Sequence, residues 1–420
     1  MAALYYYLLI AICCGLLLWG LTRAERVYQY PFFMSAIFIA FIVPQAYSLQ
    51  QNQDTVPANA LAKVLLMSCL YISMCWVGYQ IVPDKKLLQN LDIKLDDRKL
   101  FMIAIVLTII GYAATFALNG TEAQLADNNN WTGIVTIYYF IIKVIYVALA
   151  IFLIQAISKP SLIRITWVII ASIPAIAPAI FAARRTLMMV VLVIFGLSFW
   201  FVKRYVPPRS LVILLVIFGI VAIPLIGQLR GDFWGLAISG DLASISSASQ
   251  QSFDKLIEGN VLELRNAAMA IEASSVYSRY GYGTGFWDAL VFQYFPGQFF
   301  GYELKESLMF RWNLINTKEV LGYIFPNGVT FTGIGDSFME FSYFGSLIFA
   351  GIGYMFKTLW ISANYYKSKL SMLLYMGLLS PALICVTHGT TRFCKEIFFQ
   401  AVLAIIMIYF ARSKTNVNYQ

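Results

Sequence analysis

The chain has 420 residues, of which 60% are hydrophobic and only 12% are charged, and its mean hydropathy is +0.72. Soluble domains carry about 25% charged residues, so this composition excludes a water-soluble globular protein. The net charge of +9 does not indicate nucleic-acid binding, because most of the basic residues lie between the apolar runs and they form no contiguous patch.

Eleven apolar runs predict membrane-spanning helices, because about twenty residues in a helix cross a hydrocarbon core of roughly 30 Å. In chain order the runs are 4–21, 31–48, 60–82, 100–118, 133–157, 162–182, 186–202, 210–227, 338–360, 370–387 and 395–411. We therefore predict an all-α polytopic membrane protein. Its three parts are eight helices in residues 1–227, one large loop at 228–337, and three helices with a tail at 338–420.

The connections between these runs alternate in charge. Basic residues gather in every second one, at 22–30, 83–99, 158–161, 203–209 and 361–369, and Arg412 and Lys414 follow the last run. Cytoplasmic loops carry the excess of lysine and arginine. The pattern thus predicts a periplasmic N-terminus, a cytoplasmic C-terminus and a periplasmic large loop.

Two short outer turns carry cations that this orientation does not explain. Arg184 and Arg185 follow the sixth run, and Arg392 and Lys395 follow the tenth; Arg230 lies just after the eighth. Guanidinium groups and helix N-termini both bind phosphate. We predict that these five residues bind a phosphate-bearing headgroup; a miscounted span, or contacts with anionic lipid or neighbouring carboxylates, would also account for them.

The candidate catalytic residues lie in the same outer region. His388 is the only histidine of the chain, and imidazole exchanges protons near neutral pH, so it is the first candidate for a general base. Asp336 and Glu340, where the large loop re-enters the membrane, are the alternatives; a helix cap and a first-turn acid are the competing interpretations. Lys143 lies ten residues inside its run, too deep for simple snorkelling.

The large loop contains two further predicted elements. Residues 252–272 have apolar side chains at helical spacing, which predicts an amphipathic helix on the membrane surface or on the bundle. Residues 286–301 are aromatic and broken by Pro-Gly, so this segment is predicted to be re-entrant or interfacial. Its rings could stack on sugars or form a headgroup belt. The candidate sugar-binding residues are Trp287, Tyr294, Phe295 and Arg311.

The order of these motifs resembles that of the Wzy-type O-antigen or oligosaccharide repeat-unit polymerases, a family related to the O-antigen ligases. The resemblance covers the whole architecture, and its sharper parts lie after residue 182. The similar segments are Ala183-Arg184-Arg185-Thr186-Leu187, Leu229-Arg230, Gln293-Tyr294-Phe295-Pro296-Gly297, Thr332-Gly333-Ile334-Gly335-Asp336 with Phe344-Gly345, and the late turn from His388 to Arg392.

The resemblance implies a glycosyltransferase of GT-C type at the periplasmic face of the bacterial inner membrane, working without a metal or other cofactor. Such an enzyme moves a growing glycan from undecaprenyl diphosphate to a second lipid-linked repeat unit, and so builds a surface polysaccharide such as the O-antigen of lipopolysaccharide. Its partners are undecaprenyl-diphosphate-linked glycans and the lipid bilayer. A chain-length-regulating membrane co-polymerase is a further partner that the resemblance allows.

Two alternatives stay open at this point. An O-antigen ligase would share the same plan but transfer the glycan to lipid A-core, and a late outer histidine suits it. A flippase or another transporter would move the lipid-linked unit without forming a bond. Transporters often carry internal repeats and lack a large outer loop, so this loop disfavours transport.

Overall fold

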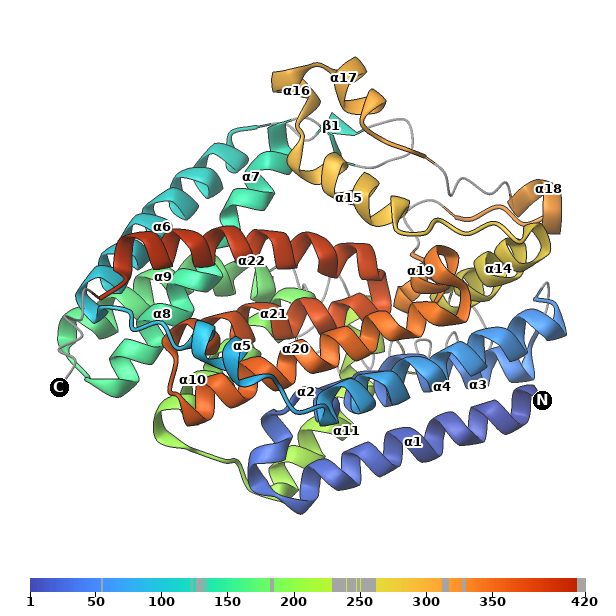
Figure 1. Ribbon diagram of the computed structural model, residues 1–420, viewed down its shortest axis with the longest axis horizontal. Helices are drawn as coiled ribbons and strands as arrows, with labels where there is room; N and C mark the ends of the chain where they lie inside the picture. The colour runs from blue at the N-terminus through green and yellow to red at the C-terminus, as the bar shows by residue number, and fades with distance from the viewer. Residues whose placement is uncertain are drawn as a thin grey trace.

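A computed structural model describes residues 1–53, 56–121, 124–125, 131–132, 134–181, 185–228, 239, 247, 250, 262–311, 317–326 and 330–413. Almost all of these residues are helical (Figure 1). The two strands among them have two residues each and pair antiparallel: β1 (Gln124–Leu125) and β2 (Trp131–Thr132).

The N-terminal half is a series of long apolar helices joined by short connections. In chain order it contains α1 (Ala2–Thr22), η1 (Ala24–Tyr28), α2 (Tyr30–Ile37), η2 (Phe38–Ile42), α3 (Val43–Gln51), α4 (Ala58–Gln80), α5 (Lys85–Leu91), α6 (Asp97–Asn119), α7 (Ile134–Ile142), α8 (Val144–Ser158), α9 (Leu162–Phe181), α10 (Arg185–Lys203) and α11 (Arg209–Gln228).

The C-terminal half begins with short helices of the large loop and ends with long helices. It contains α14 (Leu262–Tyr277), α15 (Thr284–Tyr294), α16 (Gly297–Phe300), α17 (Tyr302–Ser307), α18 (Thr317–Leu321), α19 (Thr332–Phe341), η3 (Ser342–Gly345), α20 (Ser346–Tyr365), α21 (Lys369–His388) and α22 (Thr390–Ala411).

Within the described residues, nine helical segments are long and apolar enough to cross a membrane. They are Ala2–Thr22, Tyr30–Gln51, Ala58–Gln80, Asp97–Asn119, Ile134–Ser158, Thr186–Lys203, Thr332–Tyr365, Lys369–His388 and Thr390–Ala411. The prediction of an all-α, multi-pass membrane protein is thereby confirmed. The predicted runs 162–182 and 210–227 coincide with α9 and α11, whose described apolar stretches, Leu162–Pro178 and Arg209–Phe218, are shorter.

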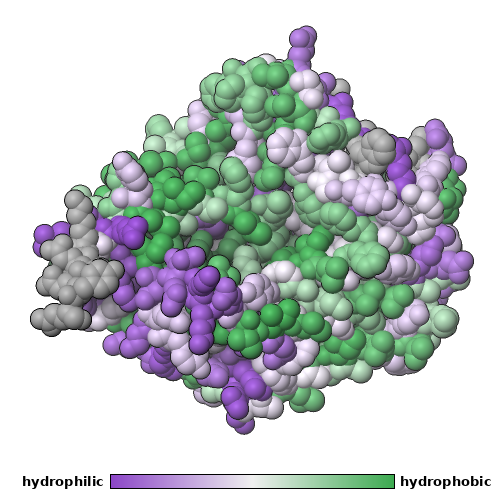
Figure 2. All heavy atoms as spheres, in the orientation of Figure 1, coloured by the Kyte–Doolittle hydropathy of each residue, from purple (hydrophilic) through white to green (hydrophobic). Residues whose placement is uncertain are grey.

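Connections that were predicted to lie on one side of the membrane do meet at one end of the bundle. Lys369, at the start of α21, forms an ion pair with Asp97, at the start of α6. The Ser368 hydroxyl donates to the Leu91 carbonyl over 2.6 Å, and Arg412 pairs with Leu95 in an isolated bridge. In Figure 2 hydrophilic residues gather at the end where α5 lies in Figure 1.

The opposite end carries the large loop. Lys63 at the start of α4 pairs with Glu272 of α14 over 2.8 Å, and the Leu264 N–H donates to the Gln45 side chain over 2.9 Å. The predicted amphipathic helix is described from residue 262 onward, whereas 252–261 lie outside the described residues. Leu264 and Ile271 are fully buried, so α14 packs on the bundle rather than on the membrane surface.

Close contact between α4 and α20 depends on glycine. A Cβ on Gly78 would lie 1.9 Å from the Ala350 carbonyl oxygen, and a Cβ on Gly353 would lie 2.4 Å from the Cys75 carbonyl oxygen. Small residues allow helix backbones to approach closely where lipid supplies no hydrophobic driving force between helices.

We expect Gly78→Ala to lower the free energy of unfolding by about 1–3 kcal/mol, because the new methyl group must push α20 away. Gly351→Ala on the facing helix α20 is the control, since nothing lies within 4 Å of a Cβ placed there. Thermal unfolding of both purified variants in detergent measures the difference. Equal midpoints would show that the two helices do not touch at Gly78.

Candidate active site

A polar cavity of about 290 Å³ lies at the end of the bundle that carries the large loop. It is bounded by α7, by α15 of the large loop, and by the turn between α21 and α22. Its described lining residues are Phe140, Lys143, Gln293, Tyr294, Thr330, His388, Thr391, Arg392, Lys395 and Glu396. Most of these side chains are polar, although the surrounding helices are apolar.

The turn between α21 and α22 shapes one wall of this cavity. Gly389 has a φ of 108°, which an L side chain rarely adopts, and it allows α22 to start directly after α21. Asp336 accepts hydrogen bonds from the Thr390 hydroxyl at 2.8 Å and the Thr391 N–H at 2.9 Å. The carboxylate therefore caps the start of α22, the helix that carries Arg392 and Lys395.

The cavity is rich in positive charge. Lys143, Arg392 and Lys395 line it together with His388, while Glu396 is the one carboxylate among its described lining residues. His388 is exposed, and its Nδ1 lies 2.5 Å from the Thr387 hydroxyl. This surplus of cations suits an anionic ligand such as a diphosphate.

Tyr294 joins the large loop to this wall. Its hydroxyl donates to the Lys395 carbonyl over 2.6 Å, and its ring packs on Phe140 and Phe398. Burial and the nearby Glu396 carboxylate raise the pKa of Tyr294, so the hydroxyl stays protonated and remains a donor. This contact fixes α15 across the mouth of the cavity.

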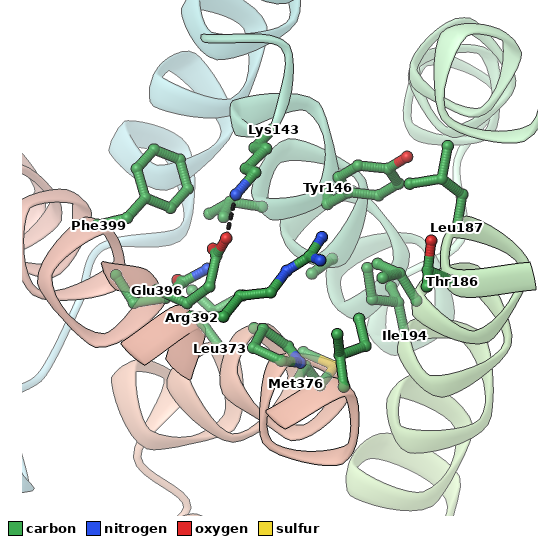
Figure 3. A pocket seen from close by; sticks show the side chains of 17 residues that line it. Lys143, Tyr146, Thr186, Leu187, Ile194, Leu373, Met376, Arg392, Glu396 and Phe399 are labelled. Carbon is green, nitrogen blue, oxygen red and sulfur yellow. Dashed lines mark hydrogen bonds and ion pairs between the residues drawn. The ribbon is translucent and has the colours of Figure 1, made fainter. Parts of the chain in front are cut away.

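A second cavity lies beside the first and is mostly apolar. It runs between α8, α10, α21 and α22, and Lys143, Arg392 and Glu396 line both cavities. Val147, Val190, Leu373, Met376 and Ile384 are among its apolar walls. Figure 3 shows Arg392 extending from α22 across this second, apolar cavity towards Ile194, with Lys143 and Glu396 paired beside it. The charged residues thus stand where a polar compartment meets an apolar one.

Of the five predicted phosphate-binding residues, two lie outside the described residues, and for a third only its position in a helix is described. Arg184 and Arg230 lie outside the described residues. Arg185 is the first residue of α10, and Thr186 and Leu187, which follow it, line the apolar cavity. The start of α10 therefore borders this cavity.

The three predicted catalytic residues have different surroundings. His388 lines the polar cavity, whereas Asp336 and Glu340 are not among the described lining residues of either cavity. Glu340 is buried, and its carboxylate accepts a hydrogen bond from the Gly283 N–H over 2.8 Å. It therefore holds the start of α15 against α19.

The predicted sugar-binding residues divide in the same way. Tyr294 lines the polar cavity, but Trp287, Phe295 and Arg311 do not belong to its described lining. Trp287 donates to the Leu308 carbonyl over 2.9 Å, and Phe295 stacks on Phe300. Arg311 pairs with Glu306 over 3.0 Å. These three stabilise the segment 284–311, whose exposed apolar residues include Phe292, Phe299 and Phe310.

The sequence alone assigns no role to Lys143 and Glu396, two residues that line the polar cavity. They form an ion pair although 253 positions separate them. A signal was present, because ionisable residues within membrane spans are rare and mark functional sites. The sequence did not show which partner each would find.

We expect Asp336→Ala to lower the free energy of unfolding by roughly 1 kcal/mol, because two hydrogen bonds at the start of α22 are lost. Asp336→Asn should cost less, since its amide oxygen still accepts from the Thr391 N–H. Thermal unfolding in detergent compares the two variants with the wild type. Equal losses in both would contradict the capping role.

We find no significant match to this chain among protein-family models, curated proteins or solved structures.

Proposed function

We propose that the protein is a polysaccharide polymerase: a membrane glycosyltransferase of GT-C type that joins undecaprenyl-diphosphate-linked repeat units at the periplasmic face of the bacterial inner membrane. The observation that carries this proposal is the pair of adjoining cavities. One is polar and lined by cations, the other is apolar and lies between helices, and Arg392 stands at their junction. This arrangement suits an amphiphile with an anionic head and a long apolar tail.

The reaction requires stabilisation of the departing diphosphate and removal of a proton from the attacking hydroxyl. Arg392 and Lys395 are the proposed diphosphate-binding residues, and His388, on the same wall of the cavity, is the proposed base. The hydroxyl of the acceptor sugar attacks the anomeric carbon, the bond to the diphosphate breaks with its electron pair, and His388 receives the proton. Asp336 is assigned to helix capping instead.

Purified protein supplied only with lipid-linked repeat units tests this proposal. A polymerase converts them into longer glycans, which gel electrophoresis and mass analysis resolve. A ligase cannot do so without lipid A-core, and a flippase forms no product. In a deletion strain, capping by single repeats indicates a polymerase, whereas loss of all surface glycan would contradict one.

The proposal also requires that the large loop face the periplasm. We expect a membrane-impermeant maleimide to label Glu303→Cys in α17 on cells with a permeabilised outer membrane. Lys94→Cys, exposed at the opposite end, should react only after lysis; the unsubstituted protein gives the background of its native cysteines. Labelling at position 94 but not at 303 would reverse the orientation.

A further inference from the structure

The Lys143–Glu396 ion pair lies at the junction of the two cavities, and both residues line both of them. Lys143 separates α7 from α8: its N–H donates to the Phe140 carbonyl over 3.3 Å, and its carbonyl accepts from the Tyr146 N–H over 3.2 Å. A tight turn of this kind inside a long helix often marks a functional position. The break therefore places a lysine where an anionic headgroup would meet its tail.

The charges around this pair are unequal. Glu396 faces Lys143, and Arg392 and Lys395 lie on the same turn of α22. An anion in the polar cavity is attracted by the three cations and repelled by the one carboxylate. A phosphate in this cavity would therefore compete with Glu396 for Lys143.

We propose that the Lys143–Glu396 ion pair is an exchangeable contact. A phosphate that occupies the polar cavity replaces Glu396 as the partner of Lys143, and Lys143 then binds the phosphate together with Arg392 and Lys395. The identity of the ligand as a polyprenyl diphosphate rests on the proposed function. The exchange itself requires only an anionic phosphate.

The surroundings of both side chains permit this exchange. The lysine side chain is 39% exposed, and its long flexible stem allows the ammonium group to move. The Glu396 side chain is 12% exposed, so an unpaired carboxylate there would be costly. Arg392, four residues earlier on α22, and Lys395 remain beside it after Lys143 leaves. The Glu396 carboxylate therefore still has positive charges nearby.

Binding of inorganic pyrophosphate and of farnesyl diphosphate to the full-length protein in detergent tests the exchange. We expect Glu396→Gln to bind both probes roughly fivefold more tightly, because Lys143 no longer has a competing partner. Lys143→Gln should bind them roughly tenfold more weakly. The two variants remove the same ion pair, so a purely structural role would change binding in the same direction in both.

Two controls test whether Lys143 exchanges partners or whether removal of any negative charge is enough to strengthen binding. Glu272→Gln removes a comparable ion pair, Lys63–Glu272, whose residues line neither cavity as described, and it should leave binding unchanged. In the double variant Lys143→Gln with Glu396→Gln, most of the gain from Glu396→Gln should disappear. If the full gain persists, the carboxylate acts by repulsion alone and the proposal is wrong.

These outcomes also distinguish the exchange from the proposed function. Opposite shifts in binding without any glycan elongation by the wild type would support the exchange and contradict the polymerase. Normal elongation together with weaker binding in both single variants would overturn the exchange alone. Failure of the wild-type protein to bind pyrophosphate would also overturn it.

Discussion

Replacement of Arg392 by alanine is expected to abolish polymer formation while the protein remains in the membrane. The guanidinium lies at the junction of the polar and apolar cavities, where a diphosphate next to its tail would be held. A charge-assisted hydrogen bond contributes about 1.5–3 kcal/mol, and more in a site that excludes water. The loss also removes stabilisation of the leaving group during the reaction.

Arg392→Lys should recover only part of this activity, because an ammonium group cannot make the bidentate contact of a guanidinium. Glycan from a complemented deletion strain, separated on gels, measures the effect, and immunoblotting of membranes confirms the protein level. Arg98→Ala, which removes an exposed arginine at the opposite end of the bundle, is the control for lost charge. Polymer of normal length from Arg392→Ala would show that this arginine contributes only to helix packing.

Replacement of His388 by glutamine is expected to lower turnover by roughly 10²–10⁴-fold with little change in the binding of pyrophosphate. Glutamine can form hydrogen bonds in the cavity but cannot accept a proton. The wild-type activity should likewise fall as the pH is lowered, because a protonated imidazole cannot act as a base. Three cations and Glu396 share this cavity, so the pH profile must be compared with that of the Gln variant.

Single-turnover elongation with purified protein measures this step separately from binding. Asp336→Asn serves as the companion variant: as a helix cap it should retain elongation, whereas as the base it would lose as much as His388→Gln. Near-normal elongation by His388→Gln would remove the imidazole as base. The departing diphosphate itself would then be the candidate acceptor of the proton.

The sequence by itself determined the class of the fold. Each apolar run supplies its own backbone hydrogen bonds as a helix and is long enough to cross the bilayer, so its position needs no knowledge of the neighbouring helices. The alternation of basic connections likewise predicted which of them share one end, as the Lys369–Asp97 pair shows. The sequence also identified His388, Arg392 and Lys395 as one group, because they lie within eight consecutive residues.

Only the tertiary structure decided which of these groups form a site. Asp336 and Glu340 are acids at the same re-entering segment as predicted, but packing turns both towards backbone N–H groups. Lys143 and Glu396, far apart in the chain, meet because α7, α8 and α22 pack together around the cavity. Periodicity and charge reveal which face of a helix is apolar, whereas the partner of a buried charge depends on contacts between distant segments, and these exist only once the helices have packed.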